Sequence, residues 1–489
     1  MAPPPRFLVA GVAIAALTAA TVATSLAIPD HLALHLGLFL VAGGLWAATL
    51  GGLAGTAPRA SDARTLVIVA LLMRLPAWLA PPVHSDDVYR YAWDGRVSRA
   101  GINPYRYAPT DPALAALRDV PAPGEAPPRG APGAPMAGEP LYPRINNREL
   151  PTIYPPAAQV VFLVAALLPL PPVVAIKLVL ALADFGVLAL LLVLLAGRDP
   201  RWAAAWAWSP LVAVEVGQNA HLEPLALVGL VAALWAWRQR RPWLAGALVG
   251  LAAAAKLFSA PLLLALRAPR AWAGAALAVT LVALPFISAG GAIAGSTGEF
   301  ARRWRGNDGA YSLVQAATDR LVCVALGAPT VEREGPRCDA PLDLWPHTAL
   351  ATRISGRPDR AAVYPDELSA FAARVIVGLL LVAACAVAVR RRLVPLAAAE
   401  LILGALLLLT PALKPWYVTW LLPLAALSRR PAWLALAALA PLAYVPLGAW
   451  LGGAPWRDPV WTRVLEHGAC WALLAAGAYR SRQGAAAEP

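Results

Sequence analysis

Long apolar runs separated by short arginine clusters constrain this 489-residue chain more than any other feature. A helix that crosses a bilayer needs about 17–25 apolar residues. Runs of that length predict helices near residues 7–28, 32–54, 64–82, 174–196, 201–217, 221–237, 271–290, 370–389, 394–411, 431–451 and 459–479, with shorter candidates at 243–257, 258–267 and 415–428. With 59% hydrophobic and 14% charged residues, the chain is predicted to be an all-α polytopic membrane protein of about 12–14 helices.

The net charge of +13 comes from basic residues that lie between the apolar runs. The clusters are Arg198/Arg201, Arg238/Arg240/Arg241, Arg267/Arg270, Arg390-Arg391-Arg392, Arg429/Arg430 and Arg480/Arg482. If all fourteen segments cross, every cluster falls on the cytoplasmic side together with both termini, which is the positive-inside pattern. We therefore expect no nucleic-acid partner. The run over 7–27 is interpreted as a retained first helix rather than a cleaved signal.

Residues 157–171 form an apolar segment bounded by Tyr154-Pro155-Pro156 and Pro171-Pro172. The segment is short, and counting it as a crossing would invert the charge bias downstream. We expect it to be re-entrant or to lie against the bundle, where protein covers its backbone.

The expected topology divides the chain into five parts. These are N-terminal membrane helices (1–82), an external catalytic loop (83–156), a central bundle (157–291), a second external loop (292–369) and C-terminal membrane helices (370–489). The first loop has an irregular Pro/Gly/Ala-rich middle from Ala108 to Pro140. In the second, Cys323 and Cys338 form a disulfide or remain free, depending on whether the compartment is oxidising.

The start of the first loop predicts a short helix over residues 86–100, with Ser85 as its N-cap and Gly101 as its stop. One stripe of this helix is apolar or aromatic, so we expect an amphipathic helix lying at the membrane surface, its start facing the bundle.

The same helix carries an acidic cluster. Asp87, Arg90 and Asp94 share one face at i, i+3 and i+7, and Asp86 reaches Arg90 at i+4. An ionised aspartate there is a candidate general base toward a hydroxyl nucleophile. The alternative is that these acids only cap a helix and pair with arginines.

Three further polar islands interrupt apolar helices on the side of the aspartates. They contain Gln218, His221 and Glu223; Lys256; and Lys414, Trp416 and Tyr417. Lysines in such a place suit an anionic group, most simply a phosphate. Taken singly, His221 is explained as a helix cap and the two aromatics as interfacial anchors. Lys177 and Asp184, seven residues apart, are expected to face the interior as a polar pair.

The motifs resemble those of integral-membrane glycosyltransferases of the GT-C fold, which use polyprenyl-phosphate-linked sugars as donors. The loop from Asp87-Val88-Tyr89-Arg90-Tyr91 to Gly101-Ile102-Asn103-Pro104-Tyr105 is similar to that of bacterial polyprenyl-phosphomannose-dependent mannosyltransferases. Tyr154-Pro155-Pro156, Gln218-Asn219-Ala220-His221 and Pro415-Trp416-Tyr417 also look like their counterparts. The chain departs from that pattern at Asn146-Asn147-Arg148-Glu149 and in its Pro- and Ala-rich loop middle.

The resemblance implies roles for individual residues. Asp87 matches the catalytic acidic position, with Asp86 as the adjacent alternative. Donor phosphate or sugar contacts are expected from Arg90, Lys256, Lys414, His221, Glu223 and Tyr154, and supporting roles from Asp94, Asn103, Gln218, Trp416 and Tyr417. No cofactor is expected, and no metal, because His84 with Asp86 and Asp87 is too small a cluster to indicate one.

The implied reaction is a single displacement that moves a hexose, in particular mannose, from a polyprenyl-phosphate donor to a glycolipid or glycan acceptor. The expected location is the extracytoplasmic face of a bacterial cytoplasmic membrane, where the lipid bilayer holds the donor's tail. Two alternatives stay open. A transporter or flippase of lipid-linked saccharides predicts inverted repeats and charges near the bilayer midplane. A non-enzymatic assembly subunit predicts silent acidic substitutions.

Overall fold

The computed structural model describes residues 6–119, 140–325, 342–343, 348–355 and 362–486. Within these residues the protein is helical, apart from one antiparallel pair of two-residue strands, β1 (Leu342–Asp343) and β2 (Ala362–Val363). The predicted all-α class is therefore confirmed. The proposed Cys323–Cys338 disulfide lies outside what the structure describes, because neither side chain is among the described ones.

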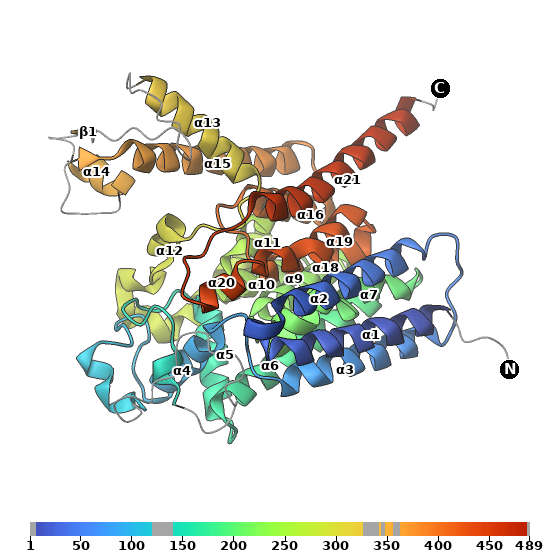
Figure 1. The fold of residues 1–489 in the computed structure, drawn as a ribbon, viewed down its shortest axis with the longest axis horizontal. Helices are drawn as coiled ribbons and strands as arrows, with labels where there is room; N and C mark the ends of the chain where they lie inside the picture. Colours follow the sequence, from blue (N-terminus) through green and yellow to red (C-terminus); the bar gives the residue numbers. More distant parts are fainter. Residues whose placement is uncertain (1–5, 120–139, 326–341, 344–347, 356–361, 487–489) are drawn as a thin grey trace.

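The first three helices are α1 (Arg6–Ser25), α2 (Ile28–Gly51) and α3 (Asp62–Leu79). They run side by side and alternate in direction, so that α3 ends where the first loop begins (Figure 1). Their predicted ranges agree with the structure to within a few residues. Trp46 ties α2 to the central bundle by donating a hydrogen bond of 2.8 Å to the Ala204 carbonyl.

The first loop folds around short helices. They are α4 (Asp87–Arg99), η1 (Pro112–Leu117), η2 (Tyr142–Arg144) and, at its end, α5 (Pro156–Leu167). The twelve residues of α5 rise only about 18 Å, too short to cross about 30 Å of hydrocarbon. The short segment predicted near 157–171 is thus observed as a helix packed against α4, α6 and α10.

The central bundle runs from α6 to η6. Its elements are α6 (Pro172–Leu194), η3 (Pro200–Ala203), α7 (Ala204–Ala207), α8 (Pro210–Val212), η4 (Ala213–Gln218), α9 (Glu223–Arg238), α10 (Pro242–Ala255), η5 (Leu257–Leu264), α11 (Pro269–Ala283) and η6 (Leu284–Ala294). The helix expected over 201–217 is wrong as a single element. Ser209 is extended before Pro210, because a residue that precedes proline disfavours the helical region.

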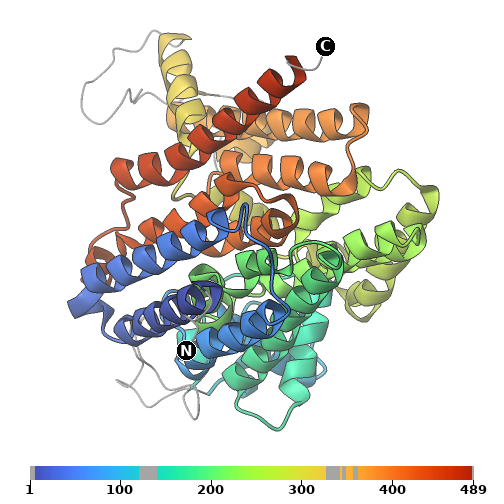
Figure 2. The same ribbon diagram turned by 90° about the vertical axis from the view of Figure 1, so that its right-hand side faces the viewer.

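The remaining elements form the second loop and the C-terminal helices. They are α12 (Thr297–Arg303), α13 (Ala310–Ala325), α14 (Thr348–Ser355), α15 (Pro365–Arg390), α16 (Pro395–Leu409), α17 (Pro415–Val418), η7 (Thr419–Leu421), α18 (Leu422–Ser428), α19 (Pro431–Leu439), η8 (Ala440–Tyr444), α20 (Leu447–Leu451) and α21 (Val460–Ala486). The helices expected over 415–428 and 431–451 are each divided into shorter turns. Figure 2 shows α13, α15 and α21 on the opposite side of the bundle from α1 and α3, as in Figure 1.

Six helical segments among the described residues are long and apolar enough to cross a membrane. They cover Arg6–Ser25, Ile28–Gly51, Pro172–Leu194, Pro269–Arg302, Pro365–Arg390 and Pro431–Leu451. Side chains such as Leu182 and Leu379 remain exposed on these segments, as lipid-facing residues do. The chain is a multi-pass membrane protein, and a total of 12–14 crossings stays a prediction.

Lys177 and Asp184 are both buried, but the expectation that they pair with each other is wrong. Lys177 donates to carbonyl oxygens at the end of α3, including that of Trp78 at 3.2 Å. Asp184 instead pairs with Arg74, at 2.7 Å. The two residues share a helix face, but α3 supplies a closer partner for each.

Candidate active site

Helix α4 is buried on nearly all sides, so the expectation of an amphipathic helix at the membrane surface is wrong. Residues Val88 to Gly95 are all buried. Tyr91 stacks on Phe162 of α5 with ring centroids 4.9 Å apart. Gly95 permits this contact, since a Cβ atom there would lie 2.4 Å from the Phe162 carbonyl oxygen. Its charged residues Arg90 and Asp94 are therefore held inside the protein rather than at a lipid surface.

The termini of α4 follow the sequence signals in part. Ser85 precedes the cap residue Asp86, and its hydroxyl accepts a hydrogen bond of 3.2 Å from the Asp87 backbone N–H. Gly101 follows the helix with φ of +76°, a left-handed conformation that glycine adopts without steric cost.

Arg90 and Asp94 form a buried ion pair at 2.9 Å. Asp94 also accepts hydrogen bonds from Thr152 at 2.5 Å and Gln159 at 3.0 Å, and Arg90 donates to the Leu150 carbonyl at 3.1 Å. These bonds attach α4 to the end of the first loop. Of the predicted charged face, Arg90 and Asp94 are thus paired with each other.

Asp86 and Asp87 are bridged by one side chain. The amide nitrogen of Asn146 donates to Asp86 Oδ1 at 2.6 Å and to Asp87 Oδ1 at 2.9 Å. The Asp87 side chain keeps 24% of its surface exposed. Asn146 lies in the stretch where the sequence departs from the resembled family.

The pKa of Asp87 is raised above its usual value, because burial disfavours the charged form. The hydrogen bond from Asn146 and the positive charges of Lys256, Lys414 and Arg90 act in the opposite direction. A carboxylate with a raised pKa is a better proton acceptor than an ordinary aspartate once it is ionised.

His221 lies between two carboxylates. Its Nδ1 is 3.8 Å from Asp87 Oδ2, and its Nε2 is 3.4 Å from Glu215 Oε2. Its ring stacks on Trp416, with centroids 3.8 Å apart and planes 16° from parallel. Glu215 is fixed in turn by the Tyr444 hydroxyl, which donates to it at 2.8 Å. The predicted residues Asp87, His221 and Trp416 are therefore brought together.

The backbone before His221 departs from regular helix. Residues 213–218 form a π-helix, a rare element that is frequent at functional sites. Ala220 then has φ of +58°, a conformation that costs a non-glycine residue energy and persists only where surrounding structure enforces it. Asn219 contributes by accepting hydrogen bonds from the backbone N–H groups of Val83 and His84 at 2.9 and 3.0 Å. This segment thus holds His221 against the start of the first loop.

Lys256 and Glu223, from two different predicted islands, form an ion pair. The Lys256 ammonium also lies over two aromatic rings, 4.9 Å from the Tyr417 centroid and 5.7 Å from that of Trp420. The indole N–H of Trp420 points at the same carboxylate at 3.4 Å. The charge of Lys256 is thus already balanced by protein groups.

The ammonium group of Lys414 has no hydrogen-bond or ion-pair partner among the residues that the structure describes. Burial lowers the pKa of its ammonium group, and the negative charges of Asp458 and Asp87 oppose that shift. A backbone bridge positions the segment: Gly306 N donates to the Pro411 carbonyl at 3.0 Å, and Leu413 N donates to the Gly306 carbonyl at 3.1 Å. The second loop therefore holds Lys414 near Asp87.

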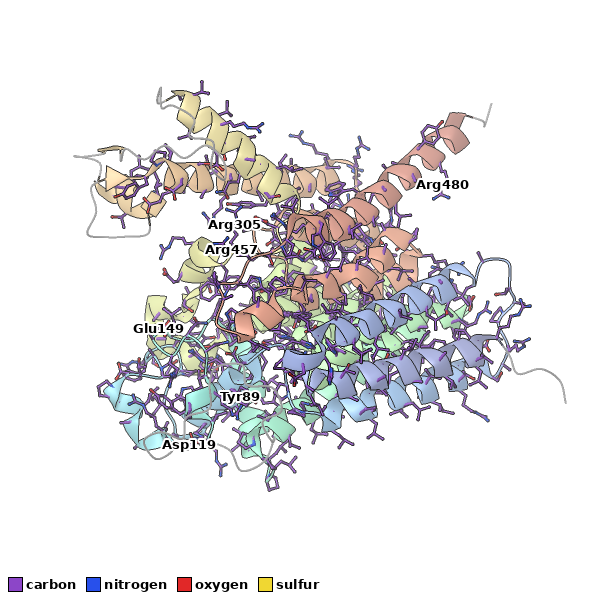
Figure 3. All side chains as sticks on the ribbon, viewed as in Figure 1. Tyr89, Asp119, Glu149, Arg305, Arg457 and Arg480 are labelled. Atoms are coloured by element: carbon purple, nitrogen blue, oxygen red, sulfur yellow. The ribbon has the colours of Figure 1, made fainter. Side chains whose placement is uncertain are left out.

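A cavity of about 760 Å³ has Lys414 and Trp416 in its wall. The rest of the lining comes from the first loop, the second loop and the C-terminal segments: His84, Asn147, Trp304, Arg305, Gly306, Asn307, Asp308, Leu413, Pro415, Ala443, Tyr444, Leu447, Trp450, Trp456, Asp458 and Arg463. Asp87 is not part of the wall, but Asn147 is adjacent to its partner Asn146. Figure 3 places Arg305 toward the same end of the molecule as Tyr89 and Glu149, with Arg480 toward the other end. The cavity thus adjoins the aspartate site.

Three residues that were predicted to belong to the site, Asn103, Gln218 and Tyr154, make contacts within the fold instead. Asn103 donates to the Phe286 carbonyl at 3.1 Å, and Gln218 donates to the Ser25 hydroxyl at 2.7 Å. The Tyr154 ring meets Tyr91 edge-on at 4.8 Å, and burial raises its hydroxyl pKa well above the usual value. The first two contacts join chain segments to one another, and the Tyr154 ring packs against α4.

Three residues of the site, Asn146, Glu215 and Tyr444, were not predicted from the sequence. Glu215 and Tyr444 lie inside apolar runs. A glutamate within a predicted membrane span is itself an indication of function, so the sequence alone could have pointed to Glu215. Among the described residues, no group of three or more His, Cys, Asp or Glu side chains is arranged to hold a metal ion. His84 turns instead toward His35, with their Nε2 atoms 3.0 Å apart.

Two family models match the chain. Residues 7–123 match the model described as alpha-(1->6)-mannopyranosyltransferase, N-terminal domain, and residues 152–333 match glycosyltransferase family 87. The first match contains Asp87, and the second contains His221 and Lys256. No curated protein matches the chain, and no solved structure does.

The buried site, the helical membrane fold and these matches together define a membrane glycosyltransferase of the GT-C class. The N-terminal match is to a mannosyltransferase model and the central match is to a glycosyltransferase model, so the chain is similar to both over separate parts of its length. The predicted enzyme class is therefore confirmed, which disfavours the transporter and the assembly subunit.

Proposed function

We propose that this enzyme transfers a mannosyl residue from a polyprenyl-phosphate donor to a hydroxyl group of a glycolipid or glycan acceptor, with Asp87 as the general base. The observation that carries the proposal is that a partly exposed carboxylate, Asp87, and a cation without an ion-pair partner, Lys414, lie within electrostatic range of each other. The first suits a hydroxyl nucleophile and the second an anionic leaving group.

In the proposed step, Asp87 Oδ2 takes the proton of the acceptor hydroxyl as its oxygen forms a bond to the anomeric carbon of the donor. The bond from that carbon to the phosphate oxygen breaks, and its electron pair leaves on the polyprenyl phosphate. The sugar passes through an oxocarbenium-like state. Lys414 stabilises the charge that develops on the phosphate, so the leaving group needs no proton.

His221 acts as a positioning residue in this proposal. Its Nδ1 lies 3.8 Å from Asp87 Oδ2, longer than a hydrogen bond, and such contacts tighten when substrate closes a site. Stacking on Trp416 and the neighbouring Glu215 carboxylate restrict the imidazole. The ring thereby limits where the Asp87 carboxylate can turn.

Arg90 and Lys256 take supporting roles rather than the donor contacts expected of them. Each is already paired, Arg90 with Asp94 and Lys256 with Glu223. Opening a buried pair to bind phosphate would leave a carboxylate uncompensated, which is costly. Phosphate binding is therefore proposed for Lys414.

The proposed orientation places the site on the extracytoplasmic face. The loop residues Tyr89 and Glu149 lie toward one end of the molecule and Arg480 toward the other (Figure 3). Arg480 belongs to one of the short arginine clusters that flank the apolar runs, and such clusters face the cytoplasm in multi-pass membrane proteins.

A transfer assay with the purified full-length protein in detergent tests this function. Incubation with a polyprenyl phosphomannose and an α-1,6-linked mannose oligosaccharide should give an acceptor extended by one mannose, measured by mass spectrometry. A transporter makes no product without a membrane to cross. Absence of product, with donor binding retained, would favour the transporter.

A further inference from the structure

The cavity next to Asp87 has two arginines in its wall, Arg305 and Arg463, and two aspartates, Asp308 and Asp458, so the arginine charges are balanced within the wall. Arg305 pairs with Asp308 at 2.9 Å, and Arg463 pairs with the same carboxylate at 2.6 Å. Lys414 is the one lining cation, within the described residues, that has no such partner. An anionic group is therefore favoured only near Lys414, and the rest of the wall suits an uncharged ligand.

Four tryptophans contribute to the wall, and two of them, Trp450 and Trp456, lie close to each other. Trp450 and Trp456 are each 38% exposed, with ring centroids 6.2 Å apart and planes at 69°. The indole N–H of Trp456 donates to Asp458 Oδ1 at 2.9 Å, and the other oxygen of Asp458 accepts from the Asn307 backbone N–H at 2.8 Å. Asp458 thus fixes the Trp456 ring to the second loop, so that one aromatic face is held rigidly beside the cavity.

Two other residues of the wall each have a buried polar atom without a hydrogen-bond partner. The Asn307 side-chain oxygen and Arg463 Nε have no hydrogen-bond partner among the described residues, although both residues line the cavity. Buried polar atoms without partners are rare and require an explanation. An acceptor and a donor without partners, in two residues of one wall, are groups that a ligand hydroxyl can satisfy after a small movement of the side chains.

We propose that this wall, formed by Trp450, Trp456, Asn307 and Arg463, binds an uncharged oligosaccharide portion of the acceptor. The apolar face of a sugar ring stacks on the tryptophans, and the sugar hydroxyls form hydrogen bonds with the unpaired Asn307 oxygen and Arg463 Nε. A lipid chain is a poorer occupant, because it leaves those polar atoms unpaired. The inference rests on the proposed function, since it assigns the acceptor of that same site.

Acceptor kinetics of Trp450→Ala, Trp456→Ala and the conservative Trp456→Phe test the proposal, with an α-1,6-linked mannose oligosaccharide as acceptor. Each alanine variant should raise the KM for the oligosaccharide about tenfold or more, the scale of losing an aromatic anchor. The KM for the donor should stay unchanged, and Trp456→Phe should restore most of the acceptor affinity. The matched control is Trp461→Ala, an exposed tryptophan that is not in the cavity wall.

An unchanged acceptor KM in the double variant Trp450→Ala/Trp456→Ala would overturn the proposal. So would an equal rise in Trp461→Ala, which indicates a general membrane-interface role for these tryptophans. If the wild-type protein transfers no mannose, binding still decides the matter. Saturation-transfer NMR with the oligosaccharide should then show contact with the wild type and its loss in the double variant. No contact with the wild type would refute the site.

Discussion

Asn146 donates hydrogen bonds to Asp86 at 2.6 Å and to Asp87 at 2.9 Å, so one amide holds both neighbouring carboxylates. The bond occupies Oδ1 of Asp87 and leaves Oδ2 on the side of His221. The two aspartates differ in their surroundings, because Asp87 faces the imidazole and the Lys414 charge. This difference supports Asp87 as the residue that takes the proton.

Asn146→Ala should move the acidic limb of the activity profile to higher pH. The Asn146 bond lowers the pKa of Asp87 against the raising effect of burial, so its loss raises that pKa further. A base with a higher pKa becomes ionised only at higher pH, and activity is lost over a wider acidic range. The pH dependence of kcat/KM measures this shift. Asn103→Ala, which loses a bond to Phe286, should leave the limb in place.

The alkaline limb of the pH profile of transfer should reflect loss of the proton from the Lys414 ammonium group. Burial lowers the pKa of this ammonium, so its charge is lost at lower pH than for an exposed lysine. Activity should therefore fall as the pH rises through that lowered value. Lys414→Arg, which stays protonated, should extend activity to higher pH at a reduced rate, and Lys414→Met should raise the KM for the donor. Identical alkaline limbs in wild type and Lys414→Arg would remove Lys414 from the phosphate site.

Gly95→Ala should reduce transfer through the position of α4. The added Cβ would lie 2.4 Å from the Phe162 carbonyl oxygen, so α4 and α5 must separate, and the start of α4 carries Asp87. Overpacking of this kind costs about 1–3 kcal/mol. Gly378→Ala is the matched control, since nothing lies within 4 Å of its added carbon. Thermal unfolding in detergent and specific activity should both fall for Gly95→Ala only.

Arg74→Met should destabilise the fold. Arg74 and Asp184 are each about 1% exposed and pair at 2.7 Å, and Trp206 donates to the same carboxylate. Removal of one partner from a buried pair costs about 3–5 kcal/mol, because the other charge stays unpaired. Thermal unfolding followed by tryptophan fluorescence should show a lower midpoint. A midpoint equal to that of wild type would mean that the pair contributes little.

Hydropathy predicted the long helices well, because a span must be continuous and apolar. It failed where proline and polar residues break a segment without ending its burial. The run over 201–217 contains Pro210 and continues into the π-helix that carries Glu215. The same limitation applied to α4, which was predicted to be an amphipathic surface helix although the protein buries its Arg90–Asp94 pair.

The candidate site was predicted in part. Segments around Asp87, His221 and Trp416 converge as expected, because each interrupts an apolar region on the same side. Spacing does not reveal which cation is already paired, so Lys256 and Lys414 looked equivalent until Glu223 was seen beside Lys256. Asn146 was not found because it lies in a loop without a periodic pattern.

The most direct test of the central claim is the rate of mannosyl transfer by Asp87→Asn compared with Asp86→Asn. Both variants keep the shape of the side chain, so folding, checked by thermal unfolding, should be retained. Asp87→Asn should lose activity by about 10²–10⁴-fold, the usual contribution of a general base, while Asp86→Asn keeps measurable transfer. Near wild-type transfer by Asp87→Asn, and by the double variant, would contradict the account.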